Sequence, residues 1–163
     1  MLSGATAAWI ALVVAGPMAL AAALWDLRRM RIPNALNIAL AAGWLPLGLA
    51  TLPLDAVGLR IAGALLVLVA GFAVFAIGKV GAGDVKMLAA GALWVPGGAA
   101  PAALLLLSAA LLIGAAAVFA ARRILASPDH PWRGLRPQAK FPMGVSIGGA
   151  LIAFLGLAVR AAS

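Results

Sequence analysis

Long apolar stretches separated by short polar loops dominate this chain of 163 residues. A helix needs about 20 apolar residues to cross a hydrocarbon core roughly 30 Å thick. The stretch 84–121 is too long for one such helix, at about 57 Å if fully helical, and the helix breaker Pro96 interrupts it. We therefore divide it in two. The predicted helices cover residues 4–25, 35–51, 58–78, 84–95, 98–121 and 141–159.

Composition supports the same picture. The chain is 66% hydrophobic and 10% charged, with a mean hydropathy of +1.15. A soluble domain with this composition would have too little polar surface to show to water. The sequence therefore predicts an all-α, polytopic membrane protein in which residues 1–163 form a single domain.

The positive charge gives the orientation. The loops 26–34, 79–86 and 122–140 carry three, two and five of the twelve basic residues. If 84–95 crosses the membrane, all three loops face the same side, as the positive-inside rule requires. We therefore expect six transmembrane helices with both termini outside. This distribution indicates topology signals rather than a nucleic-acid-binding surface, although the net charge is +8.

The chain offers few metal ligands. It has no cysteine, which excludes disulfides, thiolate metal sites and a cysteine nucleophile. The one histidine, His130, lies in a polar loop and has no second imidazole to help it hold a metal. We expect neither a metal nor another cofactor.

Two of the four acidic residues, Asp26 and Asp84, lie where an apolar stretch meets a basic loop. A carboxylate at the edge of hydrocarbon is costly, and it is a functional hypothesis by default. Gly81 and Gly83 precede the second aspartate and would let a peptide backbone approach closely. Alternatively, these glycines only end the preceding helix.

The two aspartates also have an alternative reading, in which Asp26 pairs with Arg28 or Arg29 and Asp84 pairs with Lys86. Taken together with the glycines, they favour a catalytic pair. Two carboxyls in one site tend to share a proton. The ionised one then takes a proton from water, and the protonated one polarises the carbonyl that the water attacks.

Three segments resemble the motifs of the type IV prepilin peptidases, which belong to the Gly-x-Gly-Asp intramembrane aspartyl proteases. The resemblance spans nearly the whole chain, although Met143 replaces the commoner aromatic residue of the third motif. The segments are Asp26 with Ile32-Pro33-Asn34, then Gly81-Ala82-Gly83-Asp84-Val85-Lys86, and Phe141-Pro142-Met143-Gly144.

The resemblance implies an endopeptidase of the bacterial inner membrane that removes the leader of prepilins or pseudopilins at the cytoplasmic face. Asp26 and Asp84 would be its catalytic pair, without a metal. Because the chain lacks the cysteine motifs of the larger, methylating members, it is similar to the short, peptidase-only forms of tight-adherence (Flp) pilus systems. The residues expected to support the site or bind substrate are Gly81, Gly83, Lys86, Pro33, Asn34, Pro142 and Gly144.

Two functions of other classes compete with proteolysis. One is a small ion- or proton-coupled transporter that uses the boundary aspartates. Its weakness is that no acid or histidine lies in the middle of an apolar stretch to continue a path. The other is a non-catalytic subunit of a pilus or secretion assembly.

Overall fold

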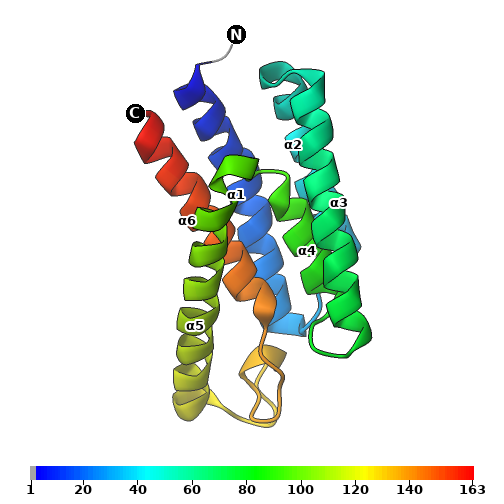
Figure 1. Cartoon of the computed structure of the whole chain (residues 1–163). Coiled ribbons are helices and arrows are strands. Elements are labelled where there is room, and N and C mark those ends of the chain that lie inside the picture. The colour runs from blue at the N-terminus through cyan, green and yellow to red at the C-terminus, as the bar shows by residue number, and fades with distance from the viewer. Residues whose placement is uncertain (1–2) are drawn as a thin grey trace.

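The computed structural model describes residues 3–163, and these fold into helices joined by short loops (Figure 1). No strand occurs within this range. The α-helices are α1 (Gly4–Arg29), α2 (Asn34–Thr51), α3 (Leu54–Ala76), α4 (Ala82–Ala92), α5 (Ala100–Leu125) and α6 (Met143–Ala162). Two short 3-10 helices are η1 (Gly97–Ala99) and η2 (Arg133–Leu135).

The helices run back and forth between two ends of the bundle (Figure 1). The loops that follow α1, α3 and α5 lie together at one end, and the start of α1 and the end of α6 lie at the other. The three basic loops of the sequence therefore meet at one end, which we call the basic end.

Four segments are long and apolar enough to cross a membrane. They are α1, α3, η1 with α5, and α6. The chain is accordingly a multi-pass membrane protein. α2 and α4 do not meet that criterion, and α4, with 11 residues, is only about 16 Å long. The crossing of the membrane by these two helices, and the placement of both termini outside, stay predictions.

Several helices have different bounds from those expected from hydropathy. α1 continues past residue 25 to Arg29, and α5 continues past residue 121 to Leu125. Both extensions are basic, with Arg28 and Arg29 in the last turn of α1, and cations stabilise the carbonyl end of a helix. Hydropathy marks the apolar part of a helix, whereas the hydrogen-bonded helix extends into the polar boundary.

α1 and α6 pack closely through small residues. Ala15, Ala19 and Ala22 of α1 are almost completely buried. Across from them, a Cβ added at Gly148 of α6 would lie 2.7 Å from the carbonyl oxygen of Ala19. Small residues allow helix backbones to approach in a membrane, where packing replaces the hydrophobic effect. This contact places the start of α6 beside the end of α1.

α4 lies at the centre of the bundle, between α2, α3 and α6. Its far end is held by two side-chain hydrogen bonds. Trp94 Nε1 donates to the Leu40 carbonyl at 3.0 Å, and Arg60 Nη1 donates to the Leu93 carbonyl at 2.9 Å. The short helix that carries Asp84 is therefore fixed from both α2 and α3. α3 itself is peripheral, because only two of its 23 residues, Val57 and Ala64, are buried.

Candidate active site

Asp26 lies in the last turn of α1 and is buried, with 6% of its surface exposed. Its Oδ2 accepts a hydrogen bond of 2.9 Å from the backbone N–H of Gly144, in the first turn of α6. The first N–H groups of a helix have no partner within the helix, so they are available to a carboxylate. α6 thus orients the Asp26 carboxyl.

The chain turns sharply directly after α1, four residues beyond Asp26. Met30 adopts a left-handed conformation, with a φ of 55°, and its N–H donates to the Asp26 carbonyl at 2.6 Å. This conformation costs a non-glycine residue about 1–2 kcal/mol. The turn carries the buried side chain of Ile32 back over the site, where Ile32 Cδ1 would lie 2.9 Å from a Cβ added at Gly144.

Asp84 lies in the first turn of α4, which follows the N-cap residue Gly81. A negative charge is favoured at this position by the helix dipole. Its Oδ2 lies against the N-cap, since a Cβ added at Gly81 would be 2.7 Å from it. Its Oδ1 is buried and has no hydrogen-bond partner.

Both aspartates line one cavity of about 370 Å³ at the basic end. They come from helices α1 and α4, which are far apart in the sequence. The other residues that line the cavity are Met30, Arg31, Ile32, Asn34, Gly81, Ala82, Gly83 and Lys86.

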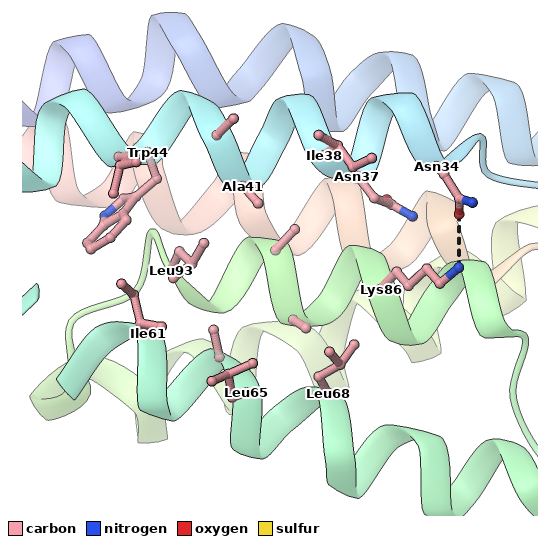
Figure 2. A pocket seen from close by; sticks show the side chains of 15 residues that line it. Asn34, Asn37, Ile38, Ala41, Trp44, Ile61, Leu65, Leu68, Lys86 and Leu93 are labelled. Carbon is pink, nitrogen blue, oxygen red and sulfur yellow. Dashed lines mark hydrogen bonds between the residues drawn. The ribbon is translucent and has the colours of Figure 1, made fainter. Parts of the chain in front are cut away.

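Three basic residues near the aspartates have other partners. The Arg28 guanidinium lies 5.1 Å from the Trp132 ring centroid, and that of Arg29 lies 4.6 Å from the Trp25 ring. Lys86 Nζ donates to Asn34 Oδ1 at 3.0 Å (Figure 2). These cations therefore bind an aromatic ring or an amide oxygen rather than the two aspartates.

The remaining expected residues surround the cavity in different ways. Gly83 packs on the loop before α2, because a Cβ there would lie 3.3 Å from Ile32 Cβ. Pro33 and Pro142 do not line the cavity but stand directly before α2 and α6. Gly144 contacts Asp26 itself. Among residues 3–163 there is no cluster of three or more histidine, cysteine or acidic residues that would hold a metal.

Sequence reasoning missed Asn37. Its side chain is buried, and its Nδ2 donates to the Gly83 carbonyl at 3.4 Å, which ties α2 to the turn that carries Asp84. The sequence contains a feature that could have drawn attention to Asn37. A second amide stands three residues after Asn34 inside an apolar stretch, on the same face of a helix.

Comparison with known families adds an independent observation. The model of the type IV leader peptidase family matches residues 13–119. The chain belongs to this family. The match includes both Asp26 and Asp84, and it ends before α6. No curated protein and no solved structure matched the chain. Membership in a peptidase family favours proteolysis over the transporter and assembly alternatives.

Proposed function

We propose that this protein is a membrane-embedded aspartyl endopeptidase that removes the leader of prepilins or pseudopilins at the cytoplasmic face of the bacterial inner membrane. The observation that carries the proposal is that Asp26 and Asp84 line one cavity at the basic end. The family supports a leader peptide as the substrate. Residues 1–163 would act as one peptidase domain, without methylating the product.

The mechanism uses the two carboxyls in different roles. The two carboxyls share a single proton, so that one of them is ionised while the other is protonated. The ionised carboxylate takes a proton from water, which attacks the scissile carbonyl, and the protonated carboxyl donates to the carbonyl oxygen. The Gly144 N–H fixes the direction of Asp26, whereas Asp84 Oδ1 is buried and has no protein partner, so that substrate binding would have to expose it to water or to the scissile carbonyl.

The proposed topology has six transmembrane helices. The three basic loops face the cytoplasm under the positive-inside rule, and both termini lie outside. Because α4 is shorter than the hydrocarbon core, its first turn would lie below the membrane surface or the bilayer would thin around it. The dyad would then act at the cytoplasmic boundary, where a leader peptide and water both have access.

The test is cleavage by the purified protein in liposomes. The substrate is an Flp-type prepilin, and the enzymes are wild type, Asp26→Asn and Asp84→Asn, with the exposed Asp55→Asn as a matched control. We expect the wild type and Asp55→Asn to release the leader. Each site variant should be slower by at least about 10²-fold, since acid–base groups contribute 10²–10⁴-fold. Cleavage at the wild-type rate by either site variant would refute the dyad.

A further inference from the structure

A groove of about 560 Å³ runs along the bundle between α2 and α3, with α4 as its floor (Figure 2). Ile38 of α2 and Leu65 and Leu68 of α3 stand on opposite sides of it (Figure 2). Its lining is apolar over most of its length. At one end the lining becomes polar, where Asn34 and Lys86 are joined by their hydrogen bond.

This polar end connects the groove to the aspartates. Asn34 and Lys86 line both the groove and the cavity of Asp26 and Asp84. A second apolar groove, of about 230 Å³, lies on the other side of α3, against α5 and α6. It shares no lining residue with the catalytic cavity. Of these two grooves beside α3, only the first leads to the dyad.

Asn37 supplies a second reason to expect a bound chain in this groove. It lines the groove, is 5% exposed, and its Oδ1 is buried without a hydrogen-bond partner. An acceptor left unpaired in an apolar environment costs free energy. The first turn of any helix has the opposite deficiency, because its N–H groups have no acceptor within the helix. If a helix began beside Asn37, one of its free N–H groups could donate to Asn37 Oδ1, and both groups would gain a hydrogen-bond partner.

Resting on the proposed function, we propose that this groove binds the transmembrane helix of the prepilin. The apolar helix lies between α2 and α3, and its first turn donates an N–H to Asn37 Oδ1. Cleavage requires extended backbone, so the residues before that turn pass Asn34 and Lys86 into the cavity. The apolar lining fits an apolar helix, and the polar end fits the point at which the helix unwinds.

Photo-crosslinking tests where the substrate helix lies. Leu65 in the proposed groove and Leu104 in the second groove are 54% and 62% exposed, which makes them a matched pair. Each is replaced by benzoylphenylalanine in an Asp84→Asn background, which retains uncleaved Flp-type prepilin. We expect a crosslink to the prepilin from position 65 and not from 104. Equal or stronger crosslinking from 104, or none from 65, would overturn the proposal.

Kinetics test the same groove in the active enzyme. Leu65→Trp fills the groove and should raise KM with little effect on kcat, whereas Leu104→Trp should leave cleavage unchanged. Asn37→Leu removes both the acceptor and the 3.4 Å hydrogen bond to the Gly83 carbonyl. Loss of the acceptor should raise KM about tenfold, the value of one hydrogen bond of about 1.4 kcal/mol, whereas loss of the bond to Gly83 acts on the position of Asp84 and so on kcat. A lower kcat at unchanged KM would contradict substrate binding by Asn37.

The same assays separate the two proposals. If the wild type does not cleave the prepilin, the proposed function fails and the docking groove fails with it. If the wild type cleaves the prepilin but Leu65→Trp behaves like Leu104→Trp, only the groove is wrong.

Discussion

The backbone N–H of Gly144 donates a 2.9 Å hydrogen bond to Oδ2 of Asp26, from 118 residues away in the sequence. A Cβ at Gly144 would lie 2.9 Å from both Cβ and Oδ2 of Asp26. Gly144→Ala would therefore displace the carboxyl together with the start of α6. We expect cleavage to fall about 10²-fold, as small misplacements of catalytic groups do.

The control for Gly144→Ala is Gly149→Ala in the same helix. A Cβ at Gly149 meets no atom within 4 Å. This variant should keep the wild-type rate, because it changes helix composition without touching Asp26. Equal activity of both variants in the liposome assay would show that the Gly144–Asp26 contact has no catalytic importance.

A side chain at Gly81 would also crowd a carboxyl of the pair, that of Asp84, but less severely than at Gly144. A Cβ at Gly81 would lie 2.7 Å from Asp84 Oδ2, which is the free end of a side chain and can rotate away. Gly81→Ala should reduce kcat about tenfold, or about 1.4 kcal/mol of transition-state stabilisation. Gly97→Ala, with open space around its Cβ, is the control. An unchanged kcat for Gly81→Ala would mean that Asp84 works without this close contact.

The contact between α5 and α6 predicts a compensating pair of substitutions. A Cβ at Gly114 would overlap the hydroxyl of Ser146, whose Oγ is buried and has no hydrogen-bond partner. Gly114→Ala should destabilise the protein by about 1–3 kcal/mol. Adding Ser146→Ala should restore stability, because the nearest atom of residue 146 would then be Cβ, at 3.6 Å.

Thermal unfolding in detergent measures this pair. Ser146→Ala alone should be neutral or stabilising, because an unpaired buried hydroxyl costs free energy. The double variant should unfold at a higher temperature than Gly114→Ala, which shows the coupling of residues in contact. If the two substitutions add independently, the helices do not meet at these residues.

Single cysteines test the proposed topology cleanly, because the chain has none of its own. Lys79→Cys lies before α4, Gly97→Cys lies after it, and Ser127→Cys marks the long basic loop; all three positions are exposed. A membrane-impermeant maleimide should label positions 79 and 127 in inside-out vesicles and position 97 in right-side-out vesicles. Labelling of 79 and 97 from the same side would mean that α4 does not cross the membrane.

The helices and the positions of the two aspartates at helix ends were predictable from the sequence, because each leaves a local signal. The lengths of the apolar stretches predict the helices, and the basic residues predict which loops lie on the same side. A carboxylate at the end of an apolar stretch is rare enough to be noticed. The helix ends were less predictable. α1 continues through Asp26 to Arg29, so this aspartate lies inside a helical turn rather than after one.

Contacts between distant segments could not be predicted, because no local pattern specifies them. Gly144 was expected to support the site, but only the packing of α6 on α1 gives it a partner. Lys86 and Asn34 were both expected there, and the structure adds that they bind each other. The sequence shows Asn37 as an amide inside an apolar stretch, but its contact with a carbonyl on α4 and its unpaired oxygen needed the structure.

The most direct test of the central claim compares Asp26→Asn, Asp84→Asn and the double variant in one cleavage assay. Residues that act as a unit are strongly non-additive. If Asp26 and Asp84 form one catalytic pair, each single variant loses nearly all cleavage, and the double variant is no slower than either. Substantial cleavage by one single variant, or losses that multiply in the double variant, would contradict a shared dyad.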